Sequence, residues 1–198
     1  MADAKSRAET AANLRAEAHA LLTDTGLFEL LQQRFGDPAV TGSASYDLMV
    51  WRQLDIHLAI EATRLPEWIG FAAELSAHFD QIGLGLPRAT FANGYVDPGP
   101  LGHGLYWGLF IKDFAANPWT INIWGWDPFD HAVRQARDFA LKTDLGECDR
   151  DLILRLKTEA RGRDNYYGVK VSCWDIYQFV IAKAGDSLGA LEAWKAKG

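Results

Sequence analysis

The chain has 198 residues, 48% of them hydrophobic and 23% charged, so it can bury a sizeable core and is not disordered as a whole. Its 20 Lys and Arg against 26 Asp and Glu give a net charge of −6, which argues against nucleic acid as a partner because phosphate neutralisation needs clustered cations. The uncharged stretches fall short of the ~20 apolar residues of a membrane helix, so no membrane partner is expected. Cys148 and Cys173 form no CxxC pair, which is typical of a reducing compartment, and we expect a cytoplasmic protein.

The first part of the chain is predicted to be helical. Residues 4–22 place alanine and leucine at helical spacing with charges on the other side, which indicates an amphipathic helix. A second helix is expected over residues 27–35, where Gly36, Asp37 and Pro38 end it.

Two short strands separated by a turn are expected next. Residues 39–41 are predicted to form a strand that runs into the small residues 42–45, which permit a tight turn. In residues 53–60 apolar and polar side chains alternate, with Asp55 and His57 on the polar side. The second strand therefore has one face suited to a core and one suited to chemistry.

The middle of the chain is predicted to contain a helix and several consecutive strands. Aromatic and aliphatic residues recur at three- and four-residue steps over residues 66–81, which indicates a helix with Pro66 in its first turn. Strands are expected over residues 89–92, 95–96, 105–114 and 119–124. Because these strands follow one another directly, at least part of the sheet is antiparallel.

The last third of the chain is predicted to be helical. Asp127 is a suitable N-cap for a helix that runs to about residue 142. Further helices are expected over residues 149–161, 172–184 and 187–196. The basic stretch 150–170 has its cations mostly outside the apolar stripe of its helix, so it is either a solvated face or a weak contact for RNA or polyphosphate.

The order of these elements resembles the nucleotidyltransferase superfamily. That superfamily has a Gly-Ser turn after a short strand, then a short spacer, then an acid-hydrophobic-acid motif on the next strand. Here Gly42-Ser43 is followed by the spacer 44–54 and by Asp55-Ile56-His57, and the position of the family's third acid falls at Asn122. The resemblance covers about residues 27–126 and implies an α+β fold: a small mixed β-sheet flanked by N-terminal and C-terminal helices. We expect a single domain, 1–198, with this core and a helical C-terminal extension over 127–198.

The resemblance also implies a function and a set of site residues. It implies transfer of a nucleotidyl group from an NTP to an acceptor, with a divalent metal, Mg²⁺ or Mn²⁺, as cofactor. The catalytic positions would be Asp55, His57 and Asn122, with Asp55 and His57 as metal ligands, because residues two apart on a strand point to one face. The residues expected to bind a nucleotide or small phosphorylated ligand are Gly42, Ser43 and Ser45, together with Lys112 from the strand pattern.

Two of the three acid positions lack an acid, since His57 and Asn122 replace carboxylates. This leaves three interpretations of Asp55 and His57. They could pair with each other or with backbone on a solvated sheet face; they could belong to an inactive nucleotide-binding or protein-interaction module; or they could belong to a working transferase. In the last case the missing acid would come from elsewhere, and the candidates in sequence are Asp113, Asp127 and Glu61.

Trp124 should lie on the same face of its strand as Asn122, because the two are two residues apart. It would either stack on a base or sugar or pack between sheet and helices.

Overall fold

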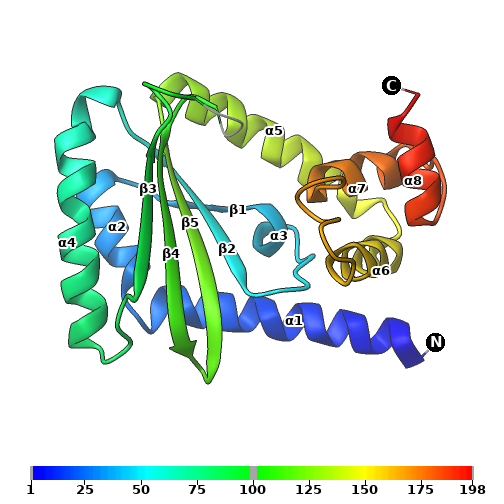
Figure 1. Ribbon diagram of the computed structural model, residues 1–198, viewed down its shortest axis with the longest axis horizontal. Helices are drawn as coiled ribbons and strands as arrows, with labels where there is room; N and C mark the ends of the chain where they lie inside the picture. The colour runs from blue at the N-terminus through cyan, green and yellow to red at the C-terminus, as the bar shows by residue number, and fades with distance from the viewer. Residues whose placement is uncertain (1, 99–101, 198) are drawn as a thin grey trace.

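The computed structural model describes residues 2–98 and 102–197, and in these ranges a five-stranded mixed sheet forms the centre of the molecule (Figure 1). The strand order is β1-β2-β5-β4-β3. The strands are β1 (Ala39–Thr41), β2 (Gln53–Ala59), β3 (Arg88–Asn93), β4 (Leu105–Phe114) and β5 (Asn117–Trp126). β2 and β5 are parallel, whereas the other neighbouring pairs are antiparallel. The predicted α+β fold with a mixed sheet is therefore confirmed.

β2 has the predicted division into an apolar and a polar face. Its residues alternate regularly between buried and partly exposed, and Leu54, Ile56 and Leu58 are fully buried. The parallel register with β5 sets Asp55 opposite Asn122. The order of the sheet thus brings together two positions that are far apart in the sequence.

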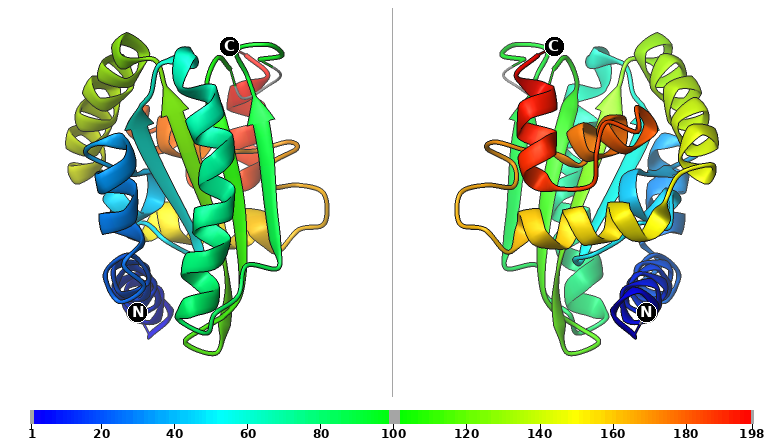
Figure 2. Two further views of the ribbon diagram at one scale, coloured as in Figure 1. Left: turned by 90° about the vertical axis from the view of Figure 1, so that its left-hand side faces the viewer. Right: turned by 90° about the vertical axis from the view of Figure 1, so that its right-hand side faces the viewer.

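Eight α-helices of the described chain surround the sheet. They are α1 (Ala2–Thr23), α2 (Leu27–Phe35), α3 (Gly42–Ser45), α4 (Leu65–Gln81), α5 (Pro128–Gly146), α6 (Arg150–Arg161), α7 (Cys173–Ile181) and α8 (Leu188–Lys195), with a 3₁₀ turn at Ala62–Arg64. α4 crosses one face of the sheet (Figure 2), and its buried Trp68, Phe71 and Phe79 recur on one side of the helix. The C-terminal helices lie on the other side of the sheet (Figure 1).

Two apolar clusters make up the core, and α1 contributes to both. One cluster lies between the sheet, α2 and α4, and it includes Leu14 and Ala18 of α1. The other cluster lies among α5, α6, α7 and α8, and it includes Ala11 of α1. α1 thus links the sheet to the C-terminal helices, and it runs along both in Figure 1. Within the described ranges, no helix has the length and apolar character needed to cross a membrane.

The expected strand at residues 95–96 is wrong. The side chain of Asn93 accepts a hydrogen bond from the backbone N–H of Tyr95 at 3.1 Å, which turns the chain at the end of β3. The hydroxyl of Tyr95 then donates to the carbonyl of Ile60 at 3.2 Å and holds this turn near the end of β2. Residues 99–101 lie outside the described residues.

Candidate functional site

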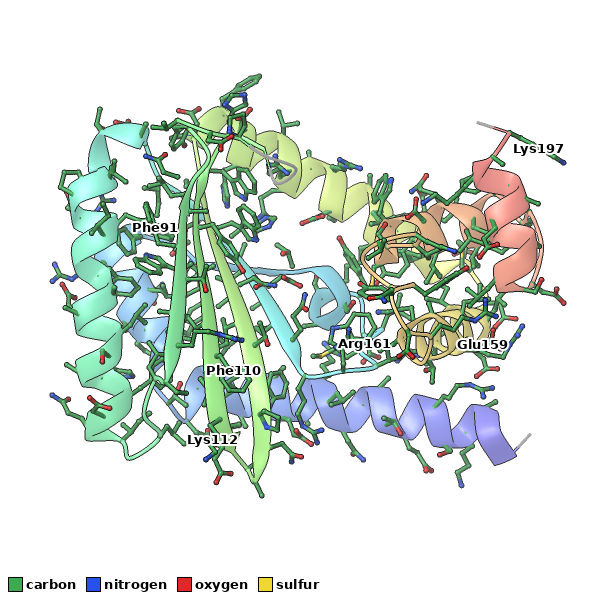
Figure 3. All side chains as sticks on the ribbon, in the orientation of Figure 1. Phe91, Phe110, Lys112, Glu159, Arg161 and Lys197 are labelled. Atoms are coloured by element: carbon green, nitrogen blue, oxygen red, sulfur yellow. The ribbon has the colours of Figure 1, made fainter. Side chains whose placement is uncertain are left out.

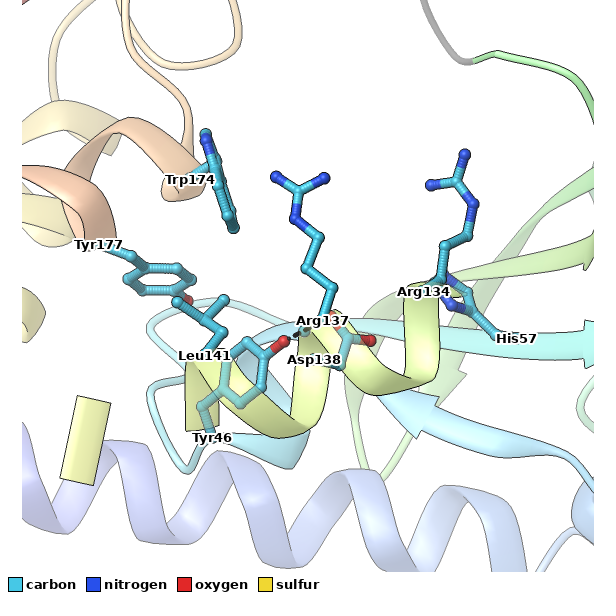
Figure 4. A pocket seen from close by; sticks show the side chains of 9 residues that line it. Tyr46, His57, Arg134, Arg137, Asp138, Leu141, Trp174 and Tyr177 are labelled. Atoms are coloured by element: carbon cyan, nitrogen blue, oxygen red, sulfur yellow. Dashed lines mark hydrogen bonds between the residues drawn. The ribbon is translucent and has the colours of Figure 1, made fainter. Parts of the chain in front are cut away.

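Two adjoining cavities lie on the polar face of β2, and together we call them the cleft. The outer cavity, of about 280 Å³, is lined by Gly42, Tyr46, His57, Arg134, Arg137, Asp138, Leu141, Trp174 and Tyr177 (Figure 4). The inner cavity, of about 150 Å³, is lined by Gly42, Ser43, Val50, Trp51, Gln53, Asp55, Tyr167, Cys173 and Tyr177. Gly42 and Tyr177 line both, so the two cavities adjoin at the turn at the start of α3.

Gly42 brings this turn against Asp55. Its φ of +63° lies in the left-handed region, where residues with a Cβ are strained. A Cβ at this position would also be only 3.1 Å from Oδ2 of Asp55. Both constraints favour glycine, and the close approach sets the backbone of the predicted Gly-Ser turn beside the carboxyl group.

Lys157 of α6 holds the turn from the other side. Its buried ammonium group donates to the Ser43 hydroxyl at 2.7 Å, to the backbone carbonyl of Leu48, and to the Tyr177 hydroxyl at 3.2 Å. Burial lowers the pKa of Lys157, while neighbouring Cys173 and Asp55 raise it. The expectation that the cations of this helix mostly point outward is wrong for Lys157.

A chain of hydrogen bonds fixes Asp55. The hydroxyl of Tyr106 donates to Oδ1 of Asn122 at 2.8 Å, and Nδ2 of Asn122 donates to Oδ1 of Asp55 at 2.8 Å. Gln53 adds longer contacts of 3.4 Å to both carboxylate oxygens. Burial raises the pKa of Asp55, and the hydrogen bonds from Asn122 and Gln53 oppose this effect. Asn122 therefore acts here as a hydrogen-bond donor at the position where the resemblance expects an acid.

His57 is a neutral imidazole at pH 7. Burial, together with the positive charges of Arg134 and His131, lowers the pKa of His57 to about 4. Its Nδ1 atom is buried and has no hydrogen-bond partner among the described residues. The ring packs edge-on against Trp126, with 5.8 Å between centroids.

Two arginines of α5 and several aromatic rings form the outer wall. Figure 4 shows Arg134 and Arg137 extending from α5 in the same direction. The guanidinium of Arg134 lies 3.5 Å from the ring centre of Trp126, and that of Arg137 lies 3.8 Å from the ring centre of Trp174. Trp124 stacks on Trp126 at 4.9 Å, so its ring packs within this aromatic group.

The acids proposed as a third carboxylate do not join Asp55. Asp113 is exposed, near the turn between β4 and β5, and Glu61 is also exposed. The carboxylate of Asp127 caps α5 by accepting from the N–H of Phe129 at 3.0 Å. The second carboxylate of the cleft is Asp138, which accepts from the Tyr46 hydroxyl at 2.8 Å. Asp138 is not among the site residues predicted from the sequence. Its spacing of four residues from Arg134 is the sequence signal that places both side chains on one face of α5.

The side chains present do not fit the divalent metal that the resemblance implies. In the described chain, no group of three His, Cys, Asp or Glu residues is placed to hold a metal ion. Asp55 already accepts hydrogen bonds, and buried Lys157 acts on it as a positive neighbour. Mg²⁺ needs several oxygen ligands, and its charge would add to that of the surrounding cations.

The structure brings together most of the predicted site residues. Gly42, Ser43, Asp55 and His57 line the cleft, and Asn122 contacts it through Asp55. Ser45 instead lines a different cavity, next to α1. Lys112 is exposed near the end of β4, four residues beyond the Gly108 that pairs with Asn122 (Figure 3). Neither Ser45 nor Lys112 is brought to the group around Asp55.

Comparison with known proteins identifies the fold. No protein-family model matches the chain, and no curated protein matches it. Among solved structures, the chain is similar to the Cid1 poly(U) polymerase, in a mutant form bound to MgATP, with a TM-score of 0.51 and 13% sequence identity. The similarity covers 81% of this chain and 48% of that chain, so this chain spans about half the length of the polymerase. The protein therefore has a nucleotidyltransferase-like fold, as the order of its elements predicts.

Proposed function

We propose that the cleft binds a nucleotide through its phosphates without a divalent metal, on a nucleotidyltransferase-like scaffold that does not transfer the nucleotidyl group. The observation that carries this proposal is the charge of the cleft. Three cations, Arg134, Arg137 and Lys157, surround it. Its two carboxyl groups are Asp138, which accepts from the neutral Tyr46 hydroxyl, and Asp55, so basic side chains outnumber acidic ones three to two.

Each part of the cleft suits one part of a nucleotide. The two guanidinium groups can donate paired hydrogen bonds to phosphate oxygens, which a lysine cannot do in the same planar geometry. The Ser43 hydroxyl lines the inner cavity, and the ammonium group of Lys157 lies directly behind it at 2.7 Å. Trp174, 40% exposed at the rim, offers a flat surface to a base.

The absence of transfer follows from the same groups. Metal-dependent transfer requires several carboxylates that share an ion and neutralise the developing charge. Here Asn122 donates to Asp55 where the resemblance expects a third acid, and the His57 imidazole replaces the second. We therefore expect the phosphates to be neutralised by side-chain cations and the bound nucleotide to stay intact.

Calorimetric titration of ATP, GTP, CTP and UTP, in EDTA and in Mg²⁺, tests this proposal. We expect saturable binding of at least one nucleotide in EDTA, and a loss of about tenfold in affinity for Arg134→Gln and for Arg137→Gln. Arg88→Gln is the matched control, because Arg88 also stacks on a ring, at 5.1 Å from the centre of Phe110, but lies on the edge strand β3.

Asp55→Asn separates this proposal from metal-dependent transfer. The amide keeps an acceptor for Asn122 and removes a negative charge from the inner cavity, so binding in EDTA should be retained or strengthened. Binding that needs Mg²⁺ and disappears in Asp55→Asn would instead favour metal-dependent transfer. If no nucleotide bound under any condition, the proposal would be wrong.

A further inference from the structure

A separate cavity of about 240 Å³ lies on the other side of α3, between α1 and the C-terminal half of α5. Its apolar part includes Leu22, Ala44 and Leu54, all buried. Leu54 precedes Asp55 on β2 and points to the opposite face of the strand, so this cavity and the cleft lie on opposite sides of β2.

α1 presents one continuous face to this cavity. Arg15, Ala18, His19 and Leu22 follow the three- and four-residue steps of a helix, so they lie on the same side. This face combines an apolar centre with a basic rim. Lys142 of α5 completes the rim.

The cations of the rim lack a strong acidic partner. No Asp or Glu is among the described residues that line the cavity. Arg15 lies 3.8 Å from the carboxylate of Asp47, which is held more closely by Arg150 at 3.0 Å. Lys142 is exposed and forms no ion pair with the described residues. A local excess of positive charge therefore surrounds an apolar cavity in a chain whose net charge is −6.

We propose that this cavity is a second binding site, for a small amphiphile with an apolar body and a single anionic head group. The apolar body would lie on Leu22, Ala44 and Leu54, where water is displaced from hydrocarbon surface. The head group, a carboxylate or a phosphate monoester, would lie between Arg15 and Lys142. Ser45, which lines the same cavity, is then a polar contact for this ligand.

Titration of the full chain with octanoate, hexyl phosphate, octanol and inorganic phosphate, followed by NMR, tests the site. We expect octanoate or hexyl phosphate to saturate signals of the cavity residues, and the tighter of the two identifies the head group. Octanol lacks the anionic head group and inorganic phosphate lacks the apolar body, so each should bind at least about tenfold more weakly.

Two charge reversals complete the experiment. Arg15→Glu and Lys142→Glu should each weaken binding of the anionic amphiphile by about tenfold or more, because each replaces attraction by repulsion. Lys112→Glu is the matched control, since it makes the same change on an exposed strand residue (Figure 3). Both sites of reversal are exposed at the rim, so the variants should fold. The proposal fails if both reversals leave binding unchanged, if octanol binds as tightly, or if no probe saturates.

Discussion

The ammonium group of Lys157 donates to the hydroxyl of Ser43 across 2.7 Å, although 114 residues separate the two in the sequence. We expect Lys157→Met to fill nearly the same volume but to leave the buried carbonyl of Leu48 without its donor, while the hydroxyls of Ser43 and Tyr177 still pair with each other at 3.1 Å. An unsatisfied buried group costs roughly 1–3 kcal/mol, so the free energy of unfolding should fall by about that amount. Urea unfolding measures this loss, and Lys112→Met, at an exposed position, should leave stability unchanged. Equal stability of the two variants would contradict the structural role of Lys157.

Gly108 keeps the network around Asp55 in place. A Cβ at this position would overlap the hydroxyl oxygen of Tyr106, so Gly108→Ala must displace the side chain whose hydroxyl donates to Asn122. We expect a lower melting temperature and weaker nucleotide binding. The matched control is Gly70→Ala, on α4, where a Cβ meets nothing within 4 Å and helix propensity should add up to about 1 kcal/mol of stability. A destabilisation of both variants by the same amount would show that the contact with Tyr106 is not the cause.

His57 should make the protein less stable in acid. The pKa of His57 is lowered to about 4 in the folded chain, against 6.5 for an ordinary histidine. Between these two values the unfolded chain binds more protons, so the free energy of unfolding falls as the pH decreases through this window, by about 3 kcal/mol in total. His57→Gln should remove this part of the pH dependence. Urea unfolding of both proteins at about pH 5 and pH 7 measures it, and parallel losses would refute the assignment.

Ser43 and Ser45 should differ in their effect on nucleotide binding. Ser43 lines the inner cavity, whereas Ser45 lines the cavity on the other side of α3. Ser43→Ala removes a hydroxyl beside Lys157 and should weaken nucleotide binding by up to about tenfold. Ser45→Ala makes the same chemical change and should leave it unaltered. Calorimetry measures the nucleotide affinity of the two variants. An equal loss of affinity in both would contradict the assignment of Ser43 and Ser45 to different cavities.

The sequence predicts the sheet side of the site well, because local patterns determine it. Alternation along residues 53–60 predicts the face that carries Asp55 and His57. The resemblance puts the position of the third acid at Asn122, and the register of the structure sets this residue opposite Asp55. The part of the site that α5 and α6 contribute depends on packing between segments far apart in the sequence. Local sequence patterns therefore predict this part less well. Lys157 follows Ile153 by four residues, so it lies on the buried stripe of α6, but a lysine in a stripe is ordinarily assigned to solvent. Arg134 and Arg137 carry no local signal that distinguishes them from other helical arginines.

The link between the Ser43 turn and Lys157 also has a consequence for the order in which the protein acquires its ligand site. A growing chain that has emerged only to the end of β5 contains Gly42, Ser43, Asp55 and Asn122, but it has neither the arginines of α5 nor the lysine of α6. The nucleotide binding that we propose would therefore require that synthesis has passed residue 157. A nucleotide that binds the cleft would then stabilise only chains in which α6 has already packed against the Ser43 turn.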